Sequence, residues 1–256
     1  MQSKFTTWQH RLGVLRSLLI YRQPWRYRRL KPLYQPWVGP GSLVFDIGAH
    51  LGDRTRTFAS LGARVIAFEP QPHLRAWLNR LEGHRAAIEI RADAVGPESG
   101  TATLAISARN PTLSTLAHQW REELAERHSG FAQVSWEDHV EVPVVTLDQL
   151  VAQYGVPDFC KIDVEGFEPQ VLAGLSQPIP ALSFEFIKGH HDQAQQCLHY
   201  LQRLDPERYR YNVVLGEQRR FHLPHWVTEA ELEVWLADAG QHVSSGDIYA
   251  QRSMAS

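Results

Sequence analysis

The chain has 256 residues, 43% of them apolar, which is enough for one large α/β domain with a well-buried core. It contains only two cysteines, Cys160 and Cys197, and their positions do not suggest a disulfide framework, so we expect a reducing, cytoplasmic setting. No run of about 20 apolar residues occurs, and Arg16 interrupts the apolar stretch 12–21. We therefore expect no signal peptide and no membrane-spanning helix.

The formal net charge of −2 hides an uneven distribution of charge. Residues 1–45 hold eight Lys or Arg and no Asp or Glu, whereas the remainder holds 18 basic and 28 acidic residues. We therefore separate a basic, aromatic N-terminal extension, residues 1–41, from a main domain, residues 42–256. The extension can be a helical arm packed on the domain or on a second subunit, or it can attract an anionic membrane surface peripherally. The acidic main domain disfavours a nucleic-acid partner.

Strand-like and helix-like segments alternate along the main domain, which predicts a parallel sheet with helices on both faces. The expected extended segments are 42–47, 64–68, 88–95, 101–106, 142–147, 159–164, 181–187, 210–215 and 247–251. The expected helices are 53–61, 72–81, 148–154, 168–175, 192–204 and 228–239. Residues 107–140 look irregular, polar and partly helical, as inserts that form lids often do.

The first expected strand, within LVFDIGAHLG, ends in a glycine turn. Asp46, Gly48 and Gly52 fit Asp-x-Gly-x-x-x-Gly, where the missing side chains let a ligand lie against the backbone. Glu69, followed by Pro70, closes the next strand, and a carboxylate there can accept hydrogen bonds from both hydroxyls of a ribose. These strand ends predict a site for an adenosine-containing ligand.

The spacing of the glycines separates two classes of cofactor. A dinucleotide requires Gly-x-Gly-x-x-Gly, because its pyrophosphate sits on a helix N-terminus. Here Ala49 and His50 lie within the turn and Asp53 begins the helix, where its carboxylate repels a pyrophosphate but not the ammonium and sulfonium of S-adenosylmethionine. S-adenosylmethionine is therefore favoured, and an NAD-type oxidoreductase is the alternative. Asp93 and Ala94, at the end of the third strand, are expected beside the adenine.

Charged residues interrupt a central apolar strand at its carboxyl end, at Lys161, Asp163 and Glu165. Buried charges are costly unless they are paired, so these residues form either a structural ion pair or a functional group. Together with Glu185, near the end of the next strand, they can form a carboxylate cluster. Such a cluster can act as a general base, or can hold a divalent cation such as Mg²⁺ through Asp163 and Glu185. The alternative bases are two histidines beyond that strand, His190 and His191.

Four longer segments also carry a family resemblance; they read DIGAHLGDRTRTFASLGARVIAFEPQP, DAVGPESGTATL, VPVVTLDQL and KIDVEGFEPQVLAGL. Over residues 42–188 they resemble the FkbM family of S-adenosylmethionine-dependent methyltransferases. The resemblance implies a doubly wound, Rossmann-like class I methyltransferase sheet, mostly parallel with an antiparallel C-terminal hairpin. It also implies O-methylation of a hydroxyl on a small-molecule or glycan acceptor: a sugar, a glycolipid or a related natural product.

The chain departs from the family at His50, where the family usually has Asn. An imidazole can still form hydrogen bonds, so we expect cofactor binding to persist. A non-catalytic scaffold on the methyltransferase fold is a further alternative, although retention of Asp46, Glu69 and Asp163 argues against it.

Overall fold

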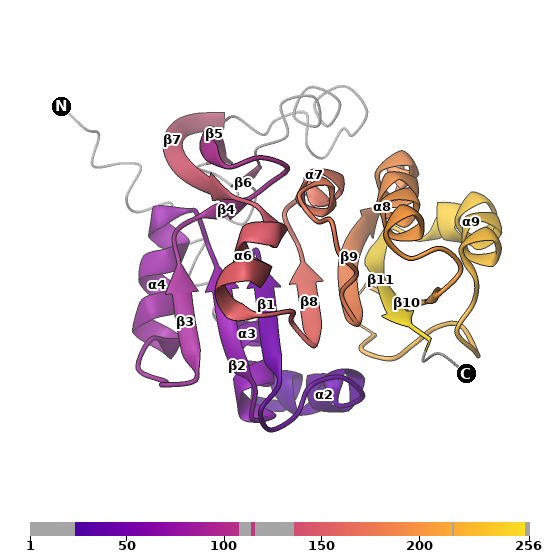
Figure 1. Cartoon of the computed structure of the whole chain (residues 1–256), viewed down its shortest axis with the longest axis horizontal. Helices are drawn as coiled ribbons and strands as arrows, with labels where there is room; N and C mark the ends of the chain where they lie inside the picture. The colour runs from indigo at the N-terminus through magenta and orange to yellow at the C-terminus, as the bar shows by residue number, and fades with distance from the viewer. Residues whose placement is uncertain (1–23, 108–113, 116–135, 217, 254–256) are drawn as a thin grey trace.

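The protein folds around a seven-stranded sheet that carries helices on both faces (Figure 1). The structure is a computed structural model and describes residues 24–107, 114–115, 136–216 and 218–253. The strand order is β10-β11-β9-β8-β1-β2-β3. These strands are β1 (Leu43–Ile47), β2 (Arg64–Phe68), β3 (Ile88–Arg91), β8 (Phe159–Ile162), β9 (Ala181–Ile187), β10 (Tyr209–Leu215) and β11 (Ser245–Arg252).

Strand direction confirms the predicted fold class. The five neighbouring strands β9, β8, β1, β2 and β3 are parallel. β11 is antiparallel to both of its neighbours, β9 and β10, so the C-terminal pair forms the expected antiparallel hairpin. In a doubly wound sheet, ligands bind at the carboxyl ends of the parallel strands, which here share one edge. The residues that follow β1, β2, β8 and β9 therefore meet at that edge.

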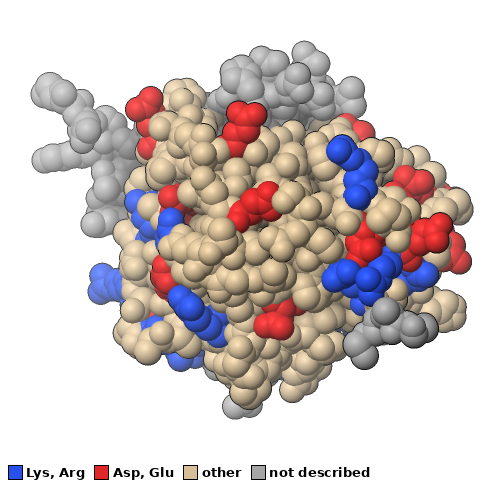
Figure 2. Space-filling model, in the orientation of Figure 1, with Lys and Arg blue, Asp and Glu red and all other residues tan. Residues whose placement is uncertain are grey.

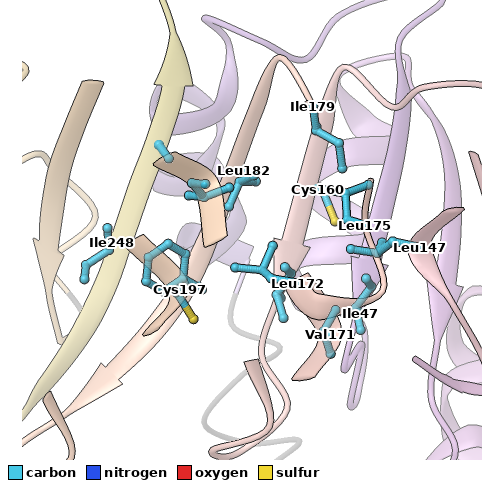
Figure 3. Close-up of a cluster of buried hydrophobic side chains, with 14 of the residues drawn as sticks. Ile47, Leu147, Cys160, Val171, Leu172, Leu175, Ile179, Leu182, Cys197 and Ile248 are labelled. Atoms are coloured by element: carbon cyan, nitrogen blue, oxygen red, sulfur yellow. The ribbon is translucent and has the colours of Figure 1, made fainter. Parts of the chain in front are cut away.

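Each face of the sheet has its own apolar core. In β1, Val44 belongs to the core beneath α2 and α3, whereas Phe45 belongs to the core beneath α6, α7, α8 and α9, as expected for a strand buried on both sides. Leu172 and Cys197 are part of the second core (Figure 3). The helices are α2 (Pro24–Tyr34), α3 (Asp53–Ser60), α4 (Pro72–Glu82), α6 (Leu147–Tyr154), α7 (Glu168–Ala173), α8 (His191–Leu204) and α9 (Glu229–Ala237), followed by the 3₁₀ turn η1 (Ala239–His242).

The protein has a second, smaller sheet, and its strands differ from two of the elements predicted from the sequence. Its strand order is β4-β7-β5-β6, and its strands are β4 (Ala94–Val95), β5 (Gly100–Ser107), β6 (Ser114–Thr115) and β7 (Trp136–Val145). The expected strand 88–95 is wrong beyond residue 91, because residues 94–95 leave the main sheet and pair with β7. The insert 107–140 is also not irregular at its end, since residues 136–140 belong to β7 and pair with β5. Residues 108–113 and 116–135 of that insert lie outside the described residues.

The described part of the N-terminal extension packs on the main domain. Leu30, Leu33 and Tyr34 of α2 are buried in the same core as Phe58 and Phe159. Residues 1–23, which carry half of the predicted basic charge, lie outside the described residues, so the attraction to an anionic surface stays a prediction.

Charged side chains of both signs are interspersed over the face seen in Figure 2. In the part of the chain that the structure describes, no helix is long and apolar enough to cross a bilayer. Cys160 and Cys197 are both buried and unbridged, in keeping with the prediction that they do not form a disulfide framework.

Candidate active site

A cavity of about 300 Å³ opens at the carboxyl edge of the parallel strands, a volume within the range of small-ligand pockets. All but one of the predicted site residues line it. They are Asp46, Gly48, Ala49, His50, Asp53, Glu69, Pro70, Asp93, Ala94, Lys161, Asp163, Glu165 and Glu185. The exception is Gly52, whose left-handed φ of +81° leads the chain into α3.

The register of the strands explains why charged side chains gather on one side of the sheet. Asp46 of β1 lies beside Lys161 of β8, and Lys161 lies beside Ser183 of β9. Their neighbours along the chain, Phe45 and Cys160, belong to the opposite core. Because side chains alternate along a strand, this polar row faces the side that α2 and α3 cover.

The turn after β1 requires glycine at position 48. Gly48 has a φ of +81°, and a Cβ there would lie 1.7 Å from the carbonyl oxygen of Asp163. The amide of Asp163 donates in turn to the carbonyl of Ile47, at 2.9 Å. The glycine turn and the loop after β8 therefore touch through their backbones, which joins the predicted cofactor residues to the predicted catalytic residues.

Glu69, which follows β2, is hydrogen-bonded to this turn. Its two carboxylate oxygens accept hydrogen bonds from the amides of His50 and Gln71, at 2.8 and 2.9 Å. His50 has a left-handed φ of +51°, a conformation in which His, like Asn, is enriched among non-glycine residues. Each oxygen of Glu69 keeps a further lone pair, and the carboxyl group lines the cavity, so it can accept from the hydroxyls of a ribose.

Ligand binding at Glu69 should depend on pH. Burial raises the pKa of this carboxyl to about 7, even though its two amide donors lower it. A carboxylate accepts from both ribose hydroxyls and a protonated acid does not, so affinity should fall as pH falls through 7. From pH 8 to pH 6 we expect the Kd for 5′-methylthioadenosine, measured calorimetrically, to rise about tenfold.

The variant Glu69→Gln provides the control for this titration. It should bind 5′-methylthioadenosine weakly and with little dependence on pH, because an amide does not titrate in this range. An affinity of the unaltered protein that is flat between pH 8 and pH 6 would contradict the assignment of Glu69 to the ribose.

The wall expected beside an adenine combines polar and apolar groups. Asp93 lines the cavity and is held by the guanidinium of Arg91, at 2.8 Å from Nε. Ala94 and Leu104 line the cavity next to it. Leu104 belongs to β5, so the second sheet contributes to the site, and the sequence analysis did not single this residue out.

Asp46 lines the cavity and is only 1% exposed. Its Oδ2 accepts a hydrogen bond from the hydroxyl of Thr55 at 2.5 Å, while Oδ1 has no hydrogen-bond partner among the described residues. Burial raises the pKa of Asp46 to about 6. Asp53 pairs with Arg54, a cavity-lining residue that sequence reasoning missed, at 2.7 Å.

The predicted catalytic carboxylates have different environments. Lys161 is 2% exposed, and its Nζ lies 2.6 Å from Oδ2 of Asp163. Burial acts to raise the pKa of Asp163, but the ammonium of Lys161 outweighs it, so this pKa lies below its ordinary value. Burial, and then the charges of Asp163 and Glu168, raise the pKa of Glu165 to about 8. The pKa of Glu185 is raised in the same way, by burial first and then by Asp163 and Glu165.

Glu168, which the sequence analysis did not select, shapes the loop that carries these carboxylates. It is 2% exposed, and its Oε1 accepts from the amides of Val164 and Gly166, at 3.0 and 3.3 Å. Glu165, between these two residues, has a left-handed φ of +53°. Glu168 begins α7, but the amides from which it accepts belong to the preceding loop, so a helix-start pattern alone does not mark this role.

Asp247 is the second acidic residue that the sequence analysis missed. It is the third residue of β11 and lies directly opposite Glu185 of β9, and both line the cavity. Two acidic side chains in this position repel each other whenever both are ionised, which is a cost typical of a functional site. Because the pairing joins distant segments, no local pattern marks Asp247.

The geometry does not support two of the predicted alternatives. Among the described residues, no group of three or more metal-ligating side chains is arranged to hold a metal ion, and the oxygen of Asp163 closest to Lys161 is already paired. The predicted Mg²⁺ site at Asp163 and Glu185 is therefore not supported. His190 and His191 lie at the start of α8 and neither lines the cavity.

The strand order, the glycine turn and the acid that follows β2 define a doubly wound α/β protein with a polar cavity at its strand ends. A family model described as the methyltransferase FkbM domain matches residues 46–243, and the chain belongs to this family. The chain therefore carries a methyltransferase FkbM domain, and this family membership counts against the NAD-type alternative.

A curated relative and two solved structures resemble the chain. The relative is the 31-O-demethyl-FK506 methyltransferase FkbM of Streptomyces tacrolimicus, 32% identical over 160 residues, 53% of this chain and 60% of that protein's length. A precorrin-6y C5,15-methyltransferase of Geobacter metallireducens is 12% identical over 89% of this chain and 86% of its own, with a TM-score of 0.46. An S-adenosylmethionine-dependent O-methyltransferase of Thermotoga maritima is 12% identical over 91% of this chain and 66% of its own, with a TM-score of 0.43.

Proposed function

We propose that this methyltransferase transfers the methyl group of S-adenosylmethionine to a hydroxyl oxygen of a sugar, glycolipid or related natural product. The observation that carries the proposal is the composition of the single cavity that holds the predicted residues. Glu69 lines it from the β2 side of β1, and Asp163, Glu165, Glu185 and Asp247 line it from β8, β9 and β11 on the other side of β1.

The residues present fit the cofactor. Glu69 offers two carboxylate oxygens to a ribose, and Asp93, Ala94 and Leu104 form a mixed wall suited to adenine. The unpartnered Oδ1 of Asp46 provides a buried acceptor in the same cavity. When bound, S-adenosylmethionine supplies a methyl carbon that its sulfonium already activates for displacement.

The work left to the chain is to orient the acceptor hydroxyl, exclude water and take up the hydroxyl proton. Asp163 suits this last role poorly, because Lys161 holds it as a carboxylate of low basicity. Glu165 is the better base, since a carboxylate with a pKa of about 8 has a stronger affinity for a proton near neutral pH. In this proposal Glu165 takes the proton, and Lys161 and Asp163 position the loop.

Two lines of support favour oxygen as the acceptor atom. Carboxylates that line the cavity beside β8, β9 and β11 can accept hydrogen bonds from several hydroxyls of one acceptor. The curated relative is named for a compound that lacks a methyl group on an oxygen, and the match spans 60% of that relative's length. Acceptor identity remains part of the proposal.

The test uses S-adenosylmethionine with a ¹³C-labelled methyl group, incubated with sugar, glycolipid and metabolite fractions. We expect label in a product whose methyl carbon has the chemical shift of an ether. Label on nitrogen or carbon would contradict O-methylation. Binding of S-adenosylhomocysteine without transfer to any fraction would instead favour the non-catalytic scaffold.

A further inference from the structure

The helix α2 lies outside residues 46–243, the part of the chain that the family model matches, yet its last residue contacts three other elements. Tyr34 is fully buried. Its ring contacts the rings of Phe58 and Phe159, with centroids 4.7 and 5.4 Å away. The hydroxyl of Tyr249 donates to the hydroxyl of Tyr34 at 3.2 Å. One side chain of α2 therefore contacts α3, β8 and β11 at once.

Both phenylalanines that contact Tyr34 lie one structural repeat from a charged residue of the cavity wall. Phe58 follows Arg54 by four residues on α3, so the two side chains share a face of that helix. Phe159 precedes Lys161 by two residues on β8, so these two share a face of the sheet. Arg54 and Lys161 line the cavity. The ring of Tyr34 is therefore placed beside the bases of two cationic side chains.

Tyr249 connects Tyr34 with an acidic residue of the cavity in the same way. It follows Asp247 by two residues on β11, and the two side chains share a face of the sheet. Arg54, Lys161 and Asp247 all interact electrostatically with Tyr34. Tyr34 does not itself line the cavity, so it can influence the reaction only through these residues.

The ammonium of Lys161 is buried and needs acceptors. The side chain is 2% exposed, and Nζ carries three donors, one of which faces Oδ2 of Asp163 at 2.6 Å. A buried ammonium is costly unless acceptors surround it. The hydroxyl oxygen of Tyr34 accepts from Tyr249 and keeps a second lone pair, which favours a cation nearby. The two hydroxyls therefore stabilise this charge in a way that an apolar ring would not.

We propose that Tyr34 is a positioning residue of the active site, whose hydroxyl, together with that of Tyr249, holds the charged groups of Lys161 and Arg54 in place beside the cavity. A helix that the family match leaves out would then belong to the catalytic unit. The competing role for Tyr34 is packing alone, and in that case the ring is needed but the hydroxyl is not.

Glu165 reports on the position of Lys161 in the proposed function, on which this inference rests. Burial and the charges of Asp163 and Glu168 raise the pKa of Glu165, and Glu185 of β9 also interacts with it, whereas the ammonium of Lys161 lowers this pKa. An ammonium that is no longer held acts less strongly on Glu165, so the pKa should rise. A smaller fraction of Glu165 is then ionised at pH 7, and less of the base is available.

The test variant is Tyr34→Phe, which keeps the ring and removes only the hydroxyl. Carboxyl ¹³C NMR measures the pKa of Glu165, and Glu165→Gln assigns its resonance. We expect this pKa to rise above the value of about 8 in the unaltered protein, and kcat at pH 7 to fall about three- to tenfold. Tyr249→Phe should have the same effect. The double variant should differ little from either single variant, because the two hydroxyls act as a unit.

Tyr209→Phe is the matched control for folding. The hydroxyl of Tyr209 is also buried and donates to the carbonyl of Ile179 at 2.7 Å, but this residue belongs to the core on the other face of the sheet. Its replacement should lower the urea midpoint at least as much as Tyr34→Phe does. It should nevertheless leave both the pKa of Glu165 and kcat unchanged.

The NMR titration needs no acceptor, so the positioning role and the proposed function can fail separately. If Tyr34→Phe leaves the pKa of Glu165 unchanged, or if Tyr209→Phe raises it equally, Tyr34 has no positioning role. If the pKa rises in Tyr34→Phe but the unaltered protein transfers no methyl group to any fraction, the positioning of Lys161 is supported and the proposed function is contradicted.

Discussion

Glu165→Gln should lower kcat about 10²- to 10⁴-fold while leaving the affinity for S-adenosylhomocysteine within about twofold, because the amide cannot take up the acceptor proton. The residue follows β8, whereas Glu69 follows β2 on the other side of β1 in the sheet, and both line the cavity. In the unaltered protein kcat should rise with pH and level off above pH 8, because only the ionised form of Glu165 is a base and burial raises its pKa to about 8.

Glu207→Gln is a matched control for this variant. Glu207 also has a left-handed φ, +62°, but it is exposed and does not line the cavity, so its replacement should leave the pH profile unchanged. Steady-state methyl transfer between pH 6 and pH 9 provides the measurement. If Glu165→Gln and Asp163→Asn both retain normal turnover, neither carboxylate is the base.

Gly48→Ala should destabilise the protein by about 3 to 5 kcal/mol and remove cofactor binding. A left-handed backbone already disfavours a side chain, and here the new Cβ would lie 1.7 Å from the carbonyl oxygen of Asp163. Since backbone supplies that contact, it cannot be relieved by a rotamer change. The glycine turn and the loop after β8 would have to separate, which would open the cavity between its two halves.

Gly41→Ala separates the backbone strain from the collision. Gly41 has nearly the same φ, +86°, but a Cβ there would meet nothing within 4 Å. Its replacement should cost about 1 to 2 kcal/mol and leave binding intact. Urea unfolding gives the free energies, and a difference of less than about 1 kcal/mol between the two variants would show that the predicted contact is unimportant.

Local sequence patterns identified most of the residues that line the cavity around the glycine turn, because these residues are close together in the chain. Asp46, Gly48 and Glu69 each sit at the end of a buried strand, and parallel strands bring such ends to one edge. Their roles remain predictions, but their meeting in one cavity follows from the strand order. The same argument placed Asp163 beside them.

Residues that depend on long-range pairing could not be predicted in this way. Asp247 enters the site only because β11 inserts antiparallel between β9 and β10, opposite Glu185. Arg54 looks like an ordinary helix residue in the sequence, and its neighbours Tyr34 and Tyr249 come from distant elements. Tertiary contacts rather than local pattern decide what these residues do.

The second sheet was partly visible in the sequence. Val140, Val142 and Val144 alternate with polar or exposed residues, which is the pattern of a strand with one buried face, and they pack in a small core with Leu104. The pairing of β7 with β5 across the insert was not predictable, because a local pattern does not identify the partner strand.

The cofactor is the central claim, and calorimetric titration of the unaltered protein with S-adenosylhomocysteine and, separately, with NAD tests it most directly. We expect S-adenosylhomocysteine to bind saturably at one site per chain, with an affinity that Glu69→Gln weakens, and NAD to show no saturable binding. Saturable binding of NAD together with no binding of S-adenosylhomocysteine would contradict the assignment of this cavity.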